Sequence, residues 1–210
     1  MILYLCIILI GMVLTVLLNW LALGWSLIDA IVWTSATTGI EIGINIALVI
    51  IAGLCVPHIF YRECKLYAVG KGEMNFYRAI RLNNWKDSII ELGFLGGFSK
   101  KKIATPDSPA YVDKFIYELN KGMFVHYIGV LGSFIILALP LPGFWSVSFI
   151  VAMFSVVLNF LPLMVLRYNK PRLLLLKKRL ERNQARTVNV SEKIEEHKEP
   201  VNNANDNKVE

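Results

Sequence analysis

His126 is the first candidate in this chain for a residue that moves a proton. It stands near the start of the apolar stretch 123–139. A neutral imidazole close to the membrane surface can act as a general base on a hydroxyl group. The alternative is a histidine that only anchors the end of a helix at the interface through its ring. The residue types around it leave both roles open.

Glu118 precedes His126 by eight residues and is its candidate carboxylate partner. On an unbroken helix the two residues lie about 12 Å apart along the axis. A direct His–Glu dyad therefore requires a kink, and Gly122 is the residue between them that favours one. Glu118 also has Lys114 four residues before it and Lys121 three residues after it, which is the spacing of ordinary surface ion pairs.

Arg167 and Arg172 follow the last apolar stretch of the chain. A guanidinium binds phosphate or carboxylate through two parallel hydrogen bonds, so this pair could clamp an anionic group. The alternative is the positive charge that commonly ends a membrane span. Pro171 disfavours helical geometry at Lys170, which predicts a turn of the chain at the membrane surface.

Glu41 and Asn45 are four residues apart, near the expected outer end of an apolar stretch. An ionisable residue within a span is a candidate functional site because its burial is costly. Gly39 and Gly43 lie beside them at the spacing that lets two membrane helices pack closely. Helix packing is therefore the favoured role for this segment.

The composition argues against several other classes of protein. The three cysteines are too few for a closed disulfide framework and lack the spacing of metal ligands, so no metal site is expected. The net charge is +6, but no nucleic-acid-binding motif accompanies it. Basic residues beside membrane spans more commonly set topology or contact anionic lipid.

Four apolar stretches must position these candidate residues. The chain is 55% hydrophobic over its 210 residues, and a transmembrane helix needs about 20 mostly apolar residues. The expected spans are 2–23, 40–59, 123–139 and 144–166. The first is expected to stay uncleaved, because no basic residue precedes it and its core is longer than that of a signal peptide. The prediction is an all-α integral membrane protein of about four transmembrane helices in two hairpins.

Every basic residue falls on one side of this predicted topology. Eleven of the 22 Lys and Arg residues lie within 58–122, and the other eleven lie from Arg167 onward. The positive-inside rule then places the loop 60–122 and both termini in the cytoplasm. The membrane domain is expected to cover 1–187, and the polar tail 188–210 is expected to be disordered.

The cytoplasmic loop carries signs of helical structure. Phe76, Tyr77 and Ile80 recur at helical spacing within 75–81, which indicates a short helix lying in the membrane interface. Ser108 followed by Pro109 is a typical helix start. The apolar residues that follow it at helical spacing predict an amphipathic helix that runs into the third span: Val112, Phe115, Ile116 and Leu119.

Three motifs occur in an order and spacing that resemble a known family. They are Asn84-Trp85-Lys86-Asp87 followed by Gly96-Gly97-Phe98-Ser99-Lys100-Lys101, then Glu118 with His126, then Arg167-Tyr168-Asn169-Lys170-Pro171-Arg172-Leu173. The last of these is the most specific. Over roughly 61–182 the chain resembles the glycosyl-4,4'-diaponeurosporenoate acyltransferases, small membrane proteins of staphyloxanthin-type carotenoid synthesis.

This resemblance implies an enzyme of the bacterial cell membrane. It would transfer a fatty acyl group to a sugar hydroxyl of a glycosylated C30 carotenoid. The acyl donor would be acyl-CoA or acyl carrier protein, with no bound cofactor, and other enzymes of the pathway are candidate partners. The remaining alternative is a non-enzymatic membrane protein, such as an assembly factor, that binds anionic lipid through its basic cytoplasmic face.

The resemblance also suggests roles for particular residues. His126 and Glu118 become the candidate catalytic residues. Lys86, Arg167 and Arg172 become candidates for binding the donor's phosphates or the acyl oxyanion. Trp85, which is expected to pack at the lipid surface, and Asn169, which stands in the third motif, complete the candidate substrate-binding set.

Overall fold

The computed structural model describes residues 2–55, 60, 65–89 and 107–206. This part of the chain is helical and contains no strand. Gly96–Lys101, which belong to the first motif of the sequence, lie outside the described residues, as does the rest of 90–106.

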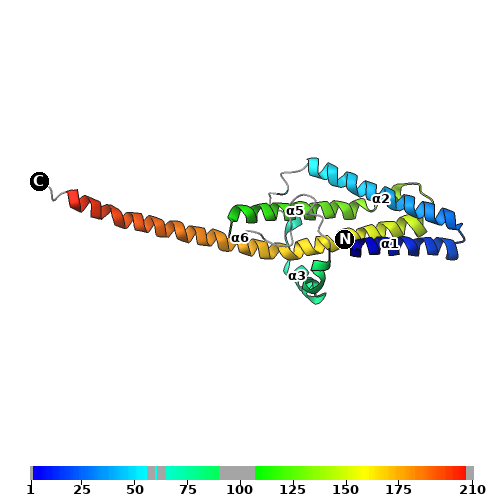
Figure 1. The fold of residues 1–210 in the computed structure, drawn as a ribbon, viewed down its shortest axis with the longest axis horizontal. Coiled ribbons are helices and arrows are strands. Elements are labelled where there is room, and N and C mark those ends of the chain that lie inside the picture. Colours follow the sequence, from blue (N-terminus) through cyan, green and yellow to red (C-terminus); the bar gives the residue numbers. More distant parts are fainter. Residues whose placement is uncertain (1, 56–59, 61–64, 90–106, 207–210) are drawn as a thin grey trace.

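Two helical hairpins form the body of the molecule. The first consists of α1 (Ile2–Leu17), the π-turn η1 (Leu18–Ala22) and α2 (Leu27–Cys55). The second consists of α5 (Pro109–Gly132), the short helices η6 (Ile135–Ala138) and η7 (Phe144–Ser148), and α6 (Phe149–Asp206). Figure 1 shows the connections of both hairpins at one end of the bundle, with α3 (Lys71–Ala79) and the protruding part of α6 toward the other.

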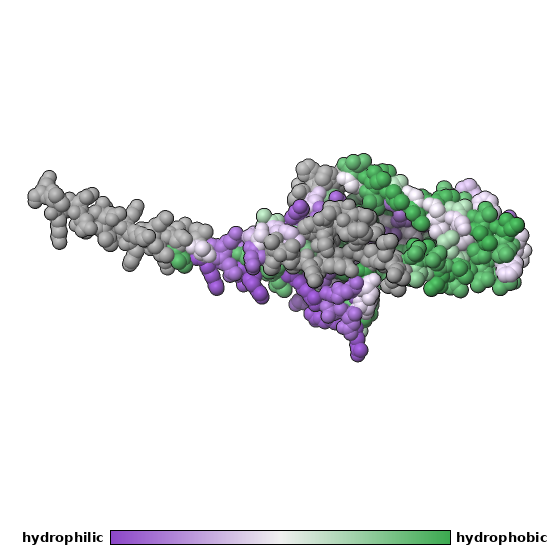
Figure 2. Space-filling model, viewed as in Figure 1, coloured by the Kyte–Doolittle hydropathy of each residue, from purple (hydrophilic) through white to green (hydrophobic). Residues whose placement is uncertain are grey.

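Four helical segments are long and apolar enough to cross a membrane, which confirms the predicted fold class. Large apolar side chains cover their outer surface, and Ile28 and Leu54 are 74% and 77% exposed. Soluble proteins rarely expose continuous apolar surface of this extent. Figure 2 shows hydrophobic residues over the bundle and hydrophilic residues over α3 and the neighbouring part of α6. We refer to the latter region as the basic end.

The second span begins earlier than the predicted 40–59, because α2 starts at Leu27. A polar helix start at Ser26, which counting apolar residues does not detect, caps this helix. The backbone amide of Asp29 donates to the Ser26 hydroxyl over 3.0 Å, and this hydroxyl donates to the Asp29 carboxylate over 2.6 Å. Thr34 and Thr37 are polar but buried in the bundle. Glu41 consequently stands at the centre of α2 rather than near its outer end.

The helix start predicted at Ser108 is confirmed. Ser108 caps α5 by accepting a hydrogen bond from the backbone amide of Tyr111 over 3.3 Å, and Pro109 is the first helical residue. The four apolar residues named above for this helix are buried. The third span therefore extends a helix that begins well before 123. It passes through Gly122 without the kink that a His–Glu dyad requires.

Close helix contacts occur at different glycines from those predicted. Gly39 and Gly43 have open space where a side chain would lie. By contrast, a Cβ atom at Gly129 would come within 2.2 Å of Asn159, and one at Gly132 within 2.2 Å of Leu48. The expected Gly39/Gly43 packing face is therefore wrong, because those residues do not point toward a neighbouring helix.

The last helix also differs from its prediction. Pro171 produces no turn, since α6 is continuous from Phe149 to Asp206. Tyr168, Lys170 and Leu173 are buried on either side of this proline, and their packing offsets the roughly 3 kcal/mol that proline costs within a helix. The tail expected to be disordered is likewise helical as far as Asp206. The four Glu and two Lys residues within 188–206 are good helix formers.

The hairpins are joined to each other at their tips, and the segment between them packs on the second hairpin at the other end. At their tips, the Asn19 amide donates to the backbone oxygen of Ser146 over 3.1 Å, and the Ser146 hydroxyl donates to Asn19 over 2.6 Å. At the basic end, α3 and α4 (Leu82–Trp85) pack against α6 through an apolar cluster that includes Tyr77, Leu82 and Tyr168. The short helix predicted at 75–81 is present as α3, which begins four residues earlier at Lys71.

Candidate active site

The imidazole of His126 faces an asparagine of α6 inside the bundle. Its Nδ1 lies 3.5 Å from Oδ1 of Asn159. The amide nitrogen of Asn159 is engaged elsewhere, because it donates to the Ser155 backbone oxygen over 3.0 Å and to Oδ1 of Asn45 over 3.4 Å. The Asn159 oxygen is therefore the atom directed at His126, and an acceptor at that place favours a proton on Nδ1. The lone pair of the neutral ring then lies on Nε2.

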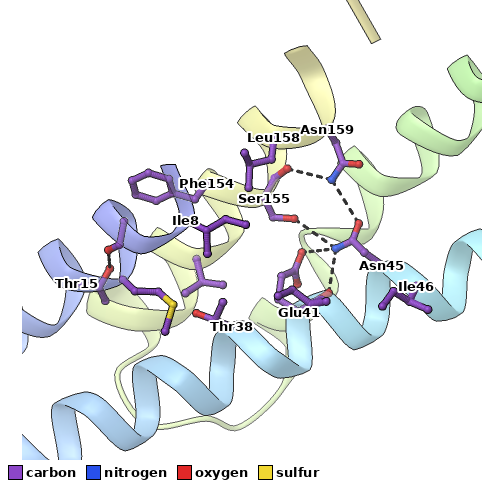
Figure 3. Close-up of a pocket in the computed structure, with 14 residues that line it drawn as sticks. Ile8, Thr15, Thr38, Glu41, Asn45, Ile46, Phe154, Ser155, Leu158 and Asn159 are labelled. Atoms are coloured by element: carbon purple, nitrogen blue, oxygen red, sulfur yellow. Dashed lines mark hydrogen bonds between the residues drawn. The ribbon is translucent and has the colours of Figure 1, made fainter. Parts of the chain in front are cut away.

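Asn159 belongs to a partly buried polar network that spans three helices. Asn45 of α2 donates to Oε1 of Glu41 over 2.7 Å and to the Ser155 hydroxyl over 3.3 Å. The hydroxyl of Ser133 on α5 donates to that of Ser155 over 2.7 Å. Figure 3 shows the Glu41, Asn45, Ser155 and Asn159 part of this network between α2 and α6. Polar groups within an apolar bundle are costly unless they are hydrogen-bonded, and they are retained mainly where they serve a function.

A cavity of about 210 Å³ lies beside the network, between α1, α2 and α6. Glu41, Asn45 and Asn159 form part of its wall (Figure 3). The other lining residues are mostly apolar and include Met12 of α1 and Phe154 of α6. The cavity therefore offers an apolar chamber that reaches the asparagine in contact with His126.

Arg167 forms a second polar cluster nearer the basic end. Its Nε and Nη2 donate to the two carboxylate oxygens of Glu73, the latter over 2.6 Å. Nη1 donates to the Tyr127 hydroxyl and, over 2.8 Å, to the backbone oxygen of Leu66. Nη2 also donates to the backbone oxygen of Ala68 over 2.8 Å. These five bonds match the five N–H groups of a guanidinium, so Arg167 in this structure ties α3 and the preceding segment to α5 and α6.

The carboxyl group of Glu73 is strongly influenced by this cluster. Burial by itself raises its pKa, but hydrogen bonds from Arg167 and Tyr77 and the charge of Arg167 outweigh burial, so the pKa lies below the ordinary value of 4.5. A carboxyl group whose pKa is lowered on folding stabilises the protein above its unfolded-state pKa. That contribution disappears as the pH falls through the folded-state pKa.

This linkage predicts how stability depends on pH. At neutral pH the Glu73→Gln variant should unfold at a lower temperature than the wild type. The difference should shrink as the pH falls from the ordinary carboxyl pKa of 4.5, where the unfolded chain takes up a proton, toward the lower pKa of the folded protein. Thermal unfolding of both proteins in detergent between pH 3 and 7 measures this. A difference that stays constant across the range would contradict the assigned ion pair.

Lys86 and Arg172 meet at the ring of Tyr168. The Lys86 ammonium lies 5.8 Å from the ring centroid, and the Arg172 guanidinium lies 4.6 Å from it. Arg172 also donates to the Tyr168 hydroxyl over 2.7 Å. Trp85 supports this arrangement: its indole donates to the backbone oxygen of Ile80 over 3.0 Å and packs against the cluster around Tyr168. Two of the predicted phosphate-binding cations thus lie over the same tyrosine ring, and we call them the cation pair.

The remaining predicted site residues are placed apart from these groups. Glu118 is on the same unbroken helix as His126, so the structure does not form the His–Glu dyad. Asn169 is half-buried on α6, and no hydrogen bond joins its side chain to another residue of the described part. His126 is also deeper than expected, because its partner Asn159 precedes Arg167 by eight residues, about 12 Å along the helix.

Several residues that organise the site are not evident from the sequence. Asn159 reaches His126 from α6 and is itself bonded to Asn45 of α2, and Glu73 and Tyr127 hold Arg167. Polar residues four apart within an apolar stretch, such as Ser155 and Asn159, are a signal of an inward-facing polar stripe. No sequence pattern indicates which helix such a stripe faces. Lys170 is buried, and its ammonium donates to Asn120 over 3.1 Å. Nothing in the sequence of its motif predicts this burial.

Comparison with known proteins now adds an independent observation. The model of the glycosyl-4,4'-diaponeurosporenoate acyltransferase family matches residues 57–179, more than half of the chain. The chain belongs to this family. Comparison with curated proteins and with solved structures finds no match.

Membership of the glycosyl-4,4'-diaponeurosporenoate acyltransferase family makes the protein an acyltransferase, and it confirms the resemblance carried by the three motifs. It also disfavours the alternative of a non-enzymatic lipid-binding protein. The matched residues include His126, Asn159 and the cation pair, whereas Glu41, Asn45 and the rest of the first hairpin precede them. The cavity is thus formed jointly by the matched region and by a hairpin outside it.

Proposed function

We propose that the protein transfers a fatty acyl group from a thioester donor to a sugar hydroxyl of a glycosylated C30 carotenoid embedded in the membrane. The family supports the type of reaction. The observation that carries the proposal is the contact between His126 and Asn159, because it orients the imidazole as a base. The acceptor and the donor are the parts of the proposal that experiment must establish.

In the proposed reaction His126 acts first as a base and then as an acid. Nε2 removes the proton of the sugar hydroxyl while the hydroxyl oxygen attacks the thioester carbonyl carbon. The tetrahedral intermediate then collapses: the new ester C–O bond is retained, the C–S bond breaks, and the departing sulfur takes the proton from His126. Asn159 accepts a hydrogen bond from Nδ1 throughout and keeps the ring in the required orientation, as the third member of a catalytic triad does.

The position of the cation pair supports acyl-CoA or acyl carrier protein as the donor. Arg172 follows Asn159 by 13 residues on α6, about 20 Å along the helix. In both donors a phosphopantetheine arm separates the phosphate from the thioester. A phosphate bound at Lys86 and Arg172 would therefore let the arm extend into the bundle toward His126. Arg167 serves a positioning role in this scheme rather than contacting the donor.

The cavity suits the acyl chain of the donor better than the carotenoid. A saturated chain is flexible, and part of it can occupy a cavity of about 210 Å³, whereas a conjugated C30 polyene is rigid and nearly as long as the bilayer is thick. The polyene would instead remain among the lipids, with its sugar brought to the bundle surface.

The proposed location is the bacterial cell membrane, with the basic end on the cytoplasmic side. The described basic residues of α3 and of the segment of α6 from Arg167 onward lie at that end, as Figure 2 shows in part. The positive-inside rule supports this orientation and a cytoplasmic location of both termini. A cytoplasmic thioester donor could then reach the cation pair directly.

Loss of the cation pair should weaken donor binding. We expect the double variant Lys86→Gln/Arg172→Gln to raise KM for the acyl donor by roughly tenfold or more, because each charged contact to phosphate is lost. The value of kcat should change much less. Steady-state kinetics with purified protein in detergent measures both. Lys178→Gln is the matched control, since it removes an exposed positive charge further along α6. An equal effect of Lys178→Gln would reduce the role of the pair to general attraction of anions.

The function is tested by expressing the protein in cells that synthesise the glycosylated carotenoid. Mass spectrometry of the pigments and lipids should reveal a product heavier by one acyl group in cells that carry the gene. The same product should form in vitro from purified protein, the glycosylated carotenoid and acyl-CoA or acyl carrier protein. Good expression without any acylated glycolipid would overturn the proposal, and acylation of another glycolipid would change the acceptor.

A further inference from the structure

Glu41 is the most unusual residue that the proposed reaction leaves without a role. Its side chain lies at the centre of a membrane-spanning helix and is 3% exposed. An ionisable side chain at such a depth is costly and is retained mainly where it serves a function. Packing, the role favoured by the sequence, does not account for it, because an apolar residue would fill the same space at lower cost.

The hydrogen bonds between Glu41 and His126 run in a single direction. The Nδ1 of His126 faces the oxygen of Asn159, the amide of Asn159 donates to the oxygen of Asn45, and the amide of Asn45 donates to the carboxyl oxygen of Glu41. In this chain every donor points toward the carboxyl group. Aligned amide dipoles polarise one another, so a change at one end is transmitted to the other.

We propose that Glu41 is a positioning residue for His126, acting through Asn45 and Asn159. This inference rests on the proposed function of His126 as the base. When the imidazole takes the hydroxyl proton it becomes positively charged. The two amides, oriented by the carboxyl group, direct their negative ends toward that developing charge and stabilise it without rearranging. The relay extends over three helices the role that a single carboxylate plays beside the histidine of a catalytic triad.

The surroundings of the relay are consistent with this role. Ser155 is hydrogen-bonded to Asn45 and to Ser133, so the first amide is held from α5 and α6 as well as from α2. The second carboxyl oxygen of Glu41 has no hydrogen-bond partner within the described residues. The first carboxyl oxygen accepts from Asn45, the residue that leads to His126, and the Ser155 and Ser133 hydroxyls also interact with the carboxyl group.

The test compares Glu41→Gln with Thr37→Val in the purified full-length protein. The glutamine keeps a hydrogen-bond acceptor for Asn45 but removes the carboxyl group. Thr37 is an equally buried polar residue one turn away on α2, and it does not line the cavity. We expect Glu41→Gln to lower kcat about tenfold, a coupling of ordinary size between linked groups, with KM changed less than about twofold. Thr37→Val should leave both constants near the wild-type values.

A second measurement reports on His126 without requiring turnover. Diethyl pyrocarbonate modifies neutral imidazole nitrogens, and peptide mass spectrometry gives the rate separately for His126, His58 and His197. Glu41→Gln should slow modification of His126 severalfold and leave the other two rates unchanged. Asn45→Leu interrupts the relay at its next member and should have the same effect. If Glu41→Gln does not fold, Asn45→Leu still tests the relay.

The outcomes separate this inference from the proposed function. Unchanged reactivity of His126 in both relay variants would overturn the inference, whether or not kcat falls. An equal fall in kcat for Thr37→Val would also overturn it, by showing a general effect of altering α2. If the wild type transfers no acyl group, the proposed function fails. The reactivity of His126 then still decides whether Glu41 acts on the imidazole.

Discussion

His126→Ala should abolish acyl transfer while leaving the protein folded in the membrane. General-base catalysis commonly contributes 10²–10⁴-fold to a rate, and we expect a loss of about that size in kcat. The substitution removes the ring that Asn159 orients and leaves the cation pair intact, so KM for the donor should change little. Product formation by mass spectrometry, at matched amounts of membrane-inserted protein, measures the effect.

His126→Asn separates the role of base from that of an anchor. Asparagine can still donate a hydrogen bond to Asn159, but it cannot accept a proton at neutral pH. A base at this position predicts that both variants are inactive. A histidine that only anchors the helix predicts that both remain active, or that His126→Asn restores what His126→Ala loses. Either of the latter results would remove His126 from the mechanism.

The largest effect on stability is expected at Arg167. Arg167→Met retains an apolar side-chain stem but leaves the Glu73 carboxylate without its main partner and removes the hydrogen bonds that Arg167 donates to two backbone oxygens. The Arg167 and Glu73 side chains are only 14% and 25% exposed. Removing one member of a buried ion pair typically costs about 3 kcal/mol or more. Thermal or denaturant unfolding in detergent should show a loss of that order.

Lys177→Met is the control for this prediction. Lys177 forms a 2.7 Å ion pair with Asp113, but the two side chains are 40% and 56% exposed. Ion pairs of this kind contribute about 1 kcal/mol or less. The two methionine variants therefore compare a partly buried arginine network with an exposed lysine pair in the same helix. Equal losses in stability would show that the Arg167 cluster does not hold α3 against the bundle.

Together these results would assign different tasks to residues that the sequence places in one group. Arg167 and Arg172 stand in the same seven-residue motif, yet Arg167 ties helices together whereas Arg172 is exposed and belongs to the cation pair at Tyr168. Their substitutions should therefore separate into a stability effect and a KM effect. Glu118 has no contact that links it to His126, so Glu118→Gln is not expected to reproduce the loss seen at His126.

The sequence by itself determined the class of the protein and the broad topology. Runs of apolar residues identify membrane helices because the bilayer requires a minimum length, and this criterion depends only on composition. The start of α5 was equally accessible, since Ser108 and Pro109 act on the nearest backbone groups. The motifs around Trp85, His126 and Arg172 were sufficient to recognise the family. Where polar residues interrupt an apolar run, the predicted helix boundary was wrong, as at the start of α2.

Only the tertiary structure decided which side chains act together. Glu41, Asn45, Asn159 and His126 come from three helices, and their contacts depend on the rotation and depth of each helix in the bundle. Rotation follows from packing between helices, such as the close approach at Gly129, which the glycine spacing of α2 did not indicate. The sequence therefore singled out His126 as a candidate base but paired it with a carboxylate that the structure does not join to it. Glu118 is near it along the chain, whereas Glu41 is linked to it through space.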